Sequence, residues 1–200
     1  MERRDIELSS GRVSYLTWGT PGPRPTVVLL HGAGFDSASL SWALLGPALA
    51  GAGYHVLAPD HPGYGHSAKA PWPATVANLV DYVGEFIEAL GLTRYAVGGL
   101  SLGGSLALSH ALTRPEGLTA LMLLAPYGIM PRVYDGRFAG LKHRLAWAMI
   151  HTRVQDALIA PMVRSRRLMA ARIASIVRNP EQRAPELMDE ILAAASPVAW

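Results

Sequence analysis

Residues 99–103 read Gly99-Leu100-Ser101-Leu102-Gly103, and this stretch decides the fold. The apolar run before it, from Tyr95 to Leu100, predicts a buried strand, and the small-residue run from Leu102 to Thr113 predicts a helix. Ser101 therefore lies at a strand-to-helix turn. Glycine is required at positions 99 and 103, because side chains there would collide across so tight a turn. We expect the turn to expose the Ser101 hydroxyl at the carboxyl edge of the sheet.

The chain before residue 130 alternates between strand-like and helix-like patterns around that turn. We predict strands at Asp5–Leu8, Val13–Trp18, Thr26–Leu30, His55–Ala58, Tyr95–Leu100 and Leu118–Ala125, and helices at Ser39–Ala50, Thr75–Leu90 and Leu102–Thr113. The first two strands are separated by Ser9-Ser10-Gly11, which favours an antiparallel hairpin at the edge of the sheet. The pattern is typical of an α/β fold with a mostly parallel, twisted sheet.

The residues after Pro126 lack strand-like runs and carry Ala, Met, Leu and Arg at helical spacing. We therefore predict a core at residues 1–130 and a helical lid or cap at residues 131–200. Lys and Arg outnumber Asp and Glu beyond residue 130, so the basic surplus belongs to the lid. We interpret its arginines as solvated side chains between apolar faces, in preference to a membrane-surface or anionic-substrate site.

The composition excludes several classes of protein. Two hundred residues, 50% hydrophobic and 16% charged, suffice for one globular domain with a sizeable core. No apolar run reaches the roughly 18 residues of a membrane span, and no signal core follows the charged N-terminus, so we expect a cytoplasmic protein without an integral membrane segment. The absence of cysteine excludes disulfides and thiolate metal sites. The net charge is +3 and the longest basic run is the pair Arg166-Arg167, so we expect no nucleic-acid partner.

The predicted helix after Ser101 also supplies electrostatic stabilisation. Its unsatisfied N–H groups and positive end point toward the serine and toward any oxyanion formed there. The N–H of Leu102 is therefore one expected donor of an oxyanion hole. The other is expected from the loop after the third predicted strand, where Gly32 and Gly34 let the backbone approach a ligand closely. Within that loop we favour the N–H of Ala33, with Gly34 next.

Three motifs occur in the order in which a known superfamily carries them. They are His31-Gly32-Ala33-Gly34-Phe35, Asp60-His61-Pro62-Gly63-Tyr64-Gly65-His66-Ser67 and the Gly-x-Ser-x-Gly turn at Ser101, each at the end of a predicted strand. On these motifs the chain resembles the α/β-hydrolase superfamily over residues 5 to 130. The resemblance implies an eight-stranded sheet with a helical lid after the sixth strand, of which this chain lacks the last two strands. Serine at position 101 argues against the superfamily's haloalkane dehalogenases and epoxide hydrolases, which have aspartate there.

The resemblance also implies roles for polar residues near the turn. His31 matches a position that organises the oxyanion loop, and Asp60 matches a position that braces a turn by holding backbone N–H groups. We interpret both, together with Gly32, as residues that structure loops rather than as catalytic groups. His61 and His66 lie in the second motif, and we expect both at the surface.

The remaining histidines are poor candidates for a catalytic base. His110 lies nine residues beyond Ser101 on the same predicted helix, too far along to reach back to the hydroxyl. His143 and His151 lie in the predicted lid, where we expect solvent-facing or interfacial positions.

The acid and the histidine that Ser101 needs are not found in the chain. In the superfamily the order is serine, acid, histidine, and the last two follow strands seven and eight. No such strands are predicted before Trp200, and Asp135 is only a weak substitute for the acid. We expect a fragment of a longer chain, the alternatives being a disrupted reading frame or a second chain that completes the sheet. We also expect these 200 residues alone to be insoluble or inactive, since an unpaired apolar edge strand invites aggregation.

The chemistry predicted for the complete protein is acyl transfer to water. Ser101 attacks a carbonyl, the Leu102 and Ala33 amides stabilise the oxyanion, and no metal or organic cofactor is required. The apolar lid favours a small hydrophobic ester or acyl substrate, as in an esterase or lipase. Carbon–carbon bond hydrolases and cofactor-free peroxidases share the fold and the serine. The alternative from another class is a non-catalytic protein of this fold that binds a hydrophobic ligand or a partner.

Overall fold

The computed structural model describes residues 1–129, 136–151, 165–176, 189 and 191. Its first part holds a six-stranded sheet in the order β1-β2-β4-β3-β5-β6. The strands are β1 (Glu2–Leu8), β2 (Gly11–Trp18), β3 (Thr26–Leu30), β4 (Val56–Pro59), β5 (Tyr95–Leu100) and β6 (Leu118–Leu124). The predicted α/β fold is therefore confirmed, and the strands predicted at 26–30 and 95–100 have the expected bounds.

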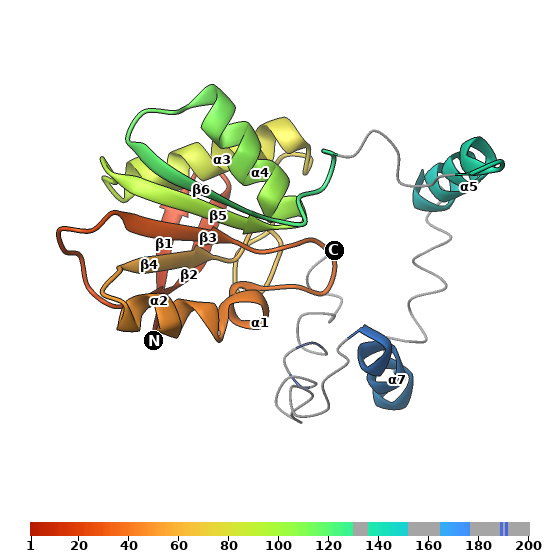
Figure 1. The fold of residues 1–200 in the computed structure, drawn as a ribbon, viewed down its shortest axis with the longest axis horizontal. Coiled ribbons are helices and arrows are strands. Elements are labelled where there is room, and N and C mark those ends of the chain that lie inside the picture. Colours follow the sequence, from red (N-terminus) through yellow and green to blue (C-terminus); the bar gives the residue numbers. More distant parts are fainter. Residues whose placement is uncertain (130–135, 152–164, 177–188, 190, 192–200) are drawn as a thin grey trace. The chain divides into compact units, whose positions relative to one another are not determined.

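The sheet is antiparallel at one edge and parallel across the rest (Figure 1). β1 and β2 form the predicted antiparallel hairpin, and β2 pairs antiparallel with β4. β4, β3, β5 and β6 run parallel to one another, with Leu30 opposite Gly99 and Leu100 opposite Leu124. The carboxyl ends of these four strands consequently meet at one edge of the sheet, where ligands bind in open α/β sheets.

Helices cover both faces of the sheet and bury two apolar clusters (Figure 1). The helices of this part are α1 (Ala38–Trp42), α2 (Leu45–Gly51), α3 (Val76–Ala89) and α4 (Leu102–Thr113). On one face α3 and α4 pack Phe86 and Leu106 against the strands, and both side chains are fully buried. On the other face α1 packs Trp42 against the strands. Burial on both faces accounts for the continuous apolar runs of β3 and β4.

The helix predicted at Ser39–Ala50 is wrong in one respect, because the structure divides it into α1 and α2. Pro47 explains the break. Proline has no N–H to donate to the carbonyl of Ala43 four residues earlier, but it fits the first turn of a new helix. α1 instead begins at its own cap, where the Ser37 hydroxyl accepts a hydrogen bond from the Leu40 N–H at 3.2 Å.

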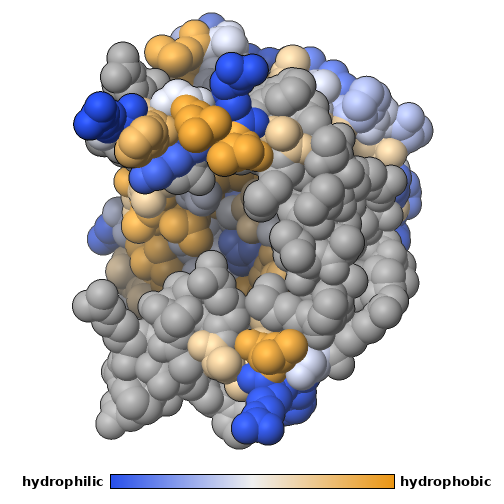
Figure 2. All heavy atoms as spheres, turned by 90° about the vertical axis from the view of Figure 1, so that its right-hand side faces the viewer, coloured by the Kyte–Doolittle hydropathy of each residue, from blue (hydrophilic) through white to orange (hydrophobic). Residues whose placement is uncertain are grey.

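The described residues from Met1 to Tyr127 form one compact unit, and a second unit begins at Gly128. The described helices of the second unit are α5 (Ala139–His151) and α7 (Arg166–Ile176). Large apolar side chains are exposed in and beside α5, namely Phe138, Leu141 and Leu145. Figure 2 colours hydrophobic residues at the surface orange. Within the described residues, no helix has both the length and the apolar character needed to cross a membrane.

Candidate active site

Ser101 adopts a backbone conformation that L-residues rarely take, with φ 52° and ψ −112°. Two hydrogen bonds hold this conformation. The Ser101 N–H donates to the Leu124 carbonyl at the end of β6, and the Ser101 carbonyl accepts from the Tyr127 N–H, both at 2.9 Å. The residue ends β5, caps the first turn of α4 and remains partly exposed. Such strain costs about 1–3 kcal/mol and persists where the surrounding structure enforces it, typically at functional sites.

Glycines permit this turn because neighbouring backbone fills the space of their absent side chains. A Cβ on Gly99 would lie 2.1 Å from the Gly103 carbonyl oxygen, and a Cβ on Gly103 would lie 2.1 Å from the Leu30 carbonyl oxygen. A Cβ on Gly32 would lie 3.6 Å from the Ser101 Cβ and 2.9 Å from the Asp36 carboxylate. The Gly32 backbone thus passes directly beside the serine.

The loop after β3 presents the Ala33 amide at this edge. The Gly32 N–H donates to Asp36 Oδ2 at 2.7 Å. Ala33 itself is exposed. Among the described residues, none accepts a hydrogen bond from the N–H of Ala33 or of Leu102, the first residue of α4. These two amides are therefore available to a ligand.

Asp36 is a loop-structuring residue that the sequence reasoning missed. Its carboxylate accepts hydrogen bonds from the backbone N–H groups of Gly32 and Ser37 and from the Ser41 hydroxyl, at 2.7–2.9 Å. The available signal was the position of an aspartate just before a serine-capped helix, where its side chain commonly holds nearby backbone.

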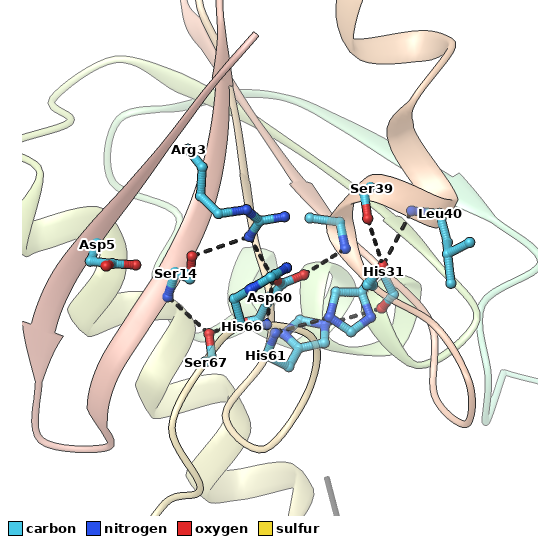
Figure 3. A network of polar contacts seen from close by, with 12 residues as sticks. Arg3, Asp5, Ser14, His31, Ser39, Leu40, Asp60, His61, His66 and Ser67 are labelled. Carbon is cyan, nitrogen blue, oxygen red and sulfur yellow. Dashed lines mark hydrogen bonds and ion pairs between the residues drawn. The ribbon is translucent and has the colours of Figure 1, made fainter. Parts of the chain in front are cut away.

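His31 lies fully buried under the loop, in contact with His61 (Figure 3). Its Nε2 accepts a hydrogen bond from the His61 N–H at 2.9 Å, and its Nδ1 lies 2.8 Å from the Gly32 carbonyl oxygen. The expectation that His61 lies at the surface is wrong, because the residue is fully buried. Its ring packs beside His31 with centroids 4.1 Å apart and lies 5.9 Å from Tyr82. His66 is exposed as expected.

Burial keeps this histidine pair neutral. It lowers the pKa of His31 to about 4, and it lowers the pKa of His61 to about 3, with the neighbouring His31 acting in the same direction. The Asp60 and Asp36 carboxylates favour the charged form of His61 but are outweighed. So low a pKa makes either ring a weak proton acceptor, and both ring nitrogens of His31 already have partners, so neither histidine is suited to be the base for Ser101.

Asp60 occupies the first position after β4 and braces the turn that follows (Figure 3). Its carboxylate accepts hydrogen bonds from the backbone N–H groups of Ala38 at 2.8 Å and His66 at 3.0 Å. It also forms an ion pair with Arg3 of β1 at 2.8 Å, and it is fully buried. One carboxylate thus connects the edge hairpin, the start of α1 and the turn beneath the site.

Among the side chains that the structure describes, no histidine ring hydrogen-bonds to Ser101. His110 is buried with Nε2 3.0 Å from the Tyr95 hydroxyl, and His55 contacts the hydroxyls of Thr17 and Thr26. Asp135 lies outside the described residues, as do the side chains of His143 and His151. Among the residues that the structure describes, no three His, Asp or Glu side chains converge as metal ligands do.

A cavity of about 390 Å³ lies at the opposite end of the strands from the serine. Its lining includes Thr26, His55 and Arg94, which stand at the amino ends of β3, β4 and β5. It is therefore no part of the carboxyl-edge site.

The chain's sequence places this site in a known family. A family model described as the alpha/beta hydrolase fold matches residues 25–173. The chain belongs to the α/β-hydrolase fold family. The matched region begins at β3 and therefore contains the three positions that this fold brings together at the carboxyl edge, His31, Asp60 and Ser101.

Similar proteins include members with different named activities. The "Dihydrolipoyllysine-residue acetyltransferase component of acetoin cleaving system" of Cupriavidus necator is 33% identical over 129 residues, covering 64% of this chain and 33% of that protein. Monoacylglycerol lipase abhd6-B of Xenopus laevis is 30% identical over 119 residues, covering 58% of this chain and 34% of that protein. The chain thus spans about a third of the length of these two relatives.

Among solved structures, a bacterial membrane phospholipase A described as a novel virulence factor superimposes with a TM-score of 0.74 at 25% identity. The superposition covers 99% of this chain and 59% of that chain. The fold of the described residues therefore has a solved neighbour in addition to the matching family model.

Proposed function

We propose that the protein is a serine hydrolase that forms an acyl-enzyme at Ser101 with an ester or a similar hydrophobic carbonyl substrate. The observation that carries the proposal is the strained Ser101 backbone, φ 52° and ψ −112°, at the junction of β5 and α4. A serine that served only to join a strand to a helix would gain nothing from this conformation, which costs free energy. The conformation instead presents the hydroxyl at the ligand-binding edge of the sheet.

The surrounding backbone supports charge development on a substrate carbonyl. Attack by Ser101 Oγ forms a bond to the carbonyl carbon and leaves a negative charge on the carbonyl oxygen. The Leu102 and Ala33 N–H groups, which have no partner among the described residues, are the proposed donors to that oxygen. The positive end of α4 adds to their effect. The hydroxyl proton passes to a general base that is not among the described residues, and water later releases the acyl group.

Two similar proteins support an ester substrate by their names. One is a monoacylglycerol lipase and the other is a phospholipase, and both names denote hydrolysis of acyl esters of glycerol. We therefore place the substrate among small hydrophobic esters.

Labelling with a fluorophosphonate tests the proposal directly. The probe forms a bond between Ser101 Oγ and phosphorus and expels fluoride, so the peptide that contains the modified serine is identified by mass spectrometry. We expect the full-length protein to be labelled at Ser101, and we expect heat denaturation to abolish labelling, because the reaction needs the folded site.

Two variants serve as controls for the labelling. Ser101→Ala should lose all labelling. Ser105→Ala, one turn further along α4, should be labelled like the wild-type protein, since the Ser105 backbone N–H rather than its hydroxyl bonds to Ser101. A folded full-length protein that leaves Ser101 unmodified would contradict the proposal and favour the non-catalytic alternative, in which the fold binds a hydrophobic ligand.

A further inference from the structure

The orientation of the Ala33 amide depends on a hydrogen bond to the carbonyl of the same peptide unit. The Gly32 carbonyl and the Ala33 N–H belong to one planar trans peptide, in which the two groups point to opposite sides. His31 Nδ1 lies 2.8 Å from the Gly32 carbonyl oxygen, on the buried side. A donor that fixes this oxygen on the buried side therefore fixes the Ala33 N–H on the other side, toward the carboxyl edge.

The hydrogen bonds of the buried pair settle which ring nitrogens carry protons. The His61 backbone N–H donates to His31 Nε2 at 2.9 Å, so that nitrogen must be the acceptor and the proton of the neutral ring lies on Nδ1. His61 Nε2 lies 3.0 Å from the His31 carbonyl oxygen, which can only accept, so the His61 ring donates from Nε2. His61, thirty positions further along the chain, thus donates two hydrogen bonds to His31, one from its backbone N–H to the ring and one from its ring to the carbonyl (Figure 3).

We propose that His61 is a positioning residue, whose ring hydrogen bond to the His31 carbonyl holds His31 and, through it, the Ala33 amide in place for the oxyanion. This inference rests on the proposed function of the site. Its structural basis is three buried hydrogen bonds. His61 donates one from its ring to the His31 carbonyl and one from its backbone N–H to the His31 ring. The His31 ring in turn donates to the Gly32 carbonyl.

A simpler role for His61, filling space between β4 and α3, makes a different prediction. The His61 ring lies 5.9 Å from the ring of Tyr82, and both are buried. If filling space were the whole role, a phenylalanine at position 61 would serve as well as histidine. If the ring N–H matters, phenylalanine leaves the buried His31 carbonyl without its donor, whereas a glutamine amide supplies one at nearly the same position.

The test compares His61→Phe and His61→Gln in the full-length protein. With p-nitrophenyl acetate as the probe, we expect His61→Phe to lower kcat at least about tenfold with KM changed less than about twofold, because oxyanion donors act on the transition state. His61→Gln should retain kcat within about threefold of the wild-type value. The control is Tyr82→Phe, which removes a buried hydroxyl without a hydrogen-bond partner among the described residues and should leave both constants unchanged.

Nuclear magnetic resonance of the wild-type protein provides a measurement that needs no activity and no variant. With ¹⁵N-labelled histidine, we expect the His31 proton on Nδ1 and the His61 proton on Nε2, and either reversed assignment overturns the proposal.

The backbone amide signal of Ala33 should move in His61→Phe and stay in place in His61→Gln and Tyr82→Phe. An Ala33 signal and kcat unaffected by His61→Phe would show that the ring only fills space. A wild-type protein without esterase activity would contradict the proposed function, while the Ala33 signal would still decide the role of His61.

Discussion

At the scale of single residues, the site is built from backbone held in fixed directions. Ser101 is strained, Gly32 is bound to Asp36 through its N–H, and His31 is bound through both ring nitrogens. Fixed donors of this kind stabilise a developing charge without reorganising during the reaction. In the proposed mechanism the side chains around the serine act chiefly by orienting peptide groups, and the amides of Ala33 and Leu102 are the proposed donors.

The buried histidine pair predicts an acid-sensitive fold. Burial lowers the pKa of His31 to about 4 and that of His61 to about 3, whereas an unfolded histidine titrates near 6.5. Below about pH 6.5 the unfolded chain therefore binds protons that the folded chain does not. We expect the free energy of unfolding to fall between pH 7 and pH 5 by about 1–2 kcal/mol for each histidine, as measured by urea denaturation.

Two variants assign this pH dependence to the pair. Asp and Glu stay ionised between pH 7 and pH 5, so they contribute little in this range. His61→Gln should reduce the loss in stability by about 1–2 kcal/mol, because the unfolded chain then binds one proton fewer. His55 and His110, whose pKa values burial also lowers, keep their share of the loss. His66→Gln replaces an exposed histidine outside the pair and is the control. An equal effect of the two variants would show that burial of the pair is not the cause.

At the scale of elements, the junction of β5 and α4 depends on two missing side chains. Gly99→Ala and Gly103→Ala each place a Cβ 2.1 Å from a backbone oxygen, which forces β5, α4 or the loop after β3 to move. We expect each variant to lower the free energy of unfolding by more than about 3 kcal/mol, measured by urea denaturation. Fluorophosphonate labelling of Ser101 should be lost at the same time.

The matched control for this prediction is Gly51→Ala at the end of α2. A Cβ on Gly51 meets nothing within 4 Å and its φ is not positive, so alanine should be neutral or stabilise the helix by up to about 1 kcal/mol. If Gly103→Ala behaved like Gly51→Ala, the close approach of α4 to β3 would not be a requirement of the turn.

The sequence predicts helices and strands best where the hydrophobic pattern and the residues that end an element indicate the same bounds. β3, β5 and α4 have the expected bounds, because each is an unbroken apolar or small-residue run bounded by glycine, proline or serine. The single helix predicted at Ser39–Ala50 is wrong because the apolar spacing continues across Pro47. One helix cannot continue across this residue, since proline has no backbone N–H to donate.

The site itself was only partly accessible from the sequence. Motif order and spacing placed the turn at Ser101 and its neighbouring loop. The burial of His61 was not predictable, since a histidine in a Pro/Gly-rich turn is ordinarily exposed, and only the structure shows the two hydrogen bonds that it donates to His31. The same holds for Asp36, whose partners come from the folded loop rather than from a pattern.

At the scale of the whole molecule, the sheet ends in an apolar edge. Within the described residues β6 pairs with β5 alone, and Leu121, Leu123 and Leu124 are 37–38% exposed. Exposed apolar edge strands template association with other chains. We expect Leu121→Lys or Leu123→Lys to increase the fraction of the 200-residue polypeptide that stays in the supernatant after centrifugation and elutes as a monomer.

A charge placed elsewhere distinguishes edge protection from a general effect of net charge. Leu112 lies on α4 and is 75% exposed, so Leu112→Lys adds the same charge away from the edge. We expect it to improve recovery much less than the β6 variants do. Equal improvement by all three substitutions would locate the cause in the net charge of the chain rather than in β6.

The backbone partners of Ser101 also constrain when the turn can form during synthesis. Its N–H and carbonyl bond to Leu124 and Tyr127, which the ribosome adds roughly twenty-five residues later. At about 5–20 residues per second, a nascent chain thus carries the complete Gly-x-Ser-x-Gly segment for one to several seconds before the partners that bend it exist. The reactive geometry is therefore a late product of translation, assembled when β6 docks and not when the serine itself is made.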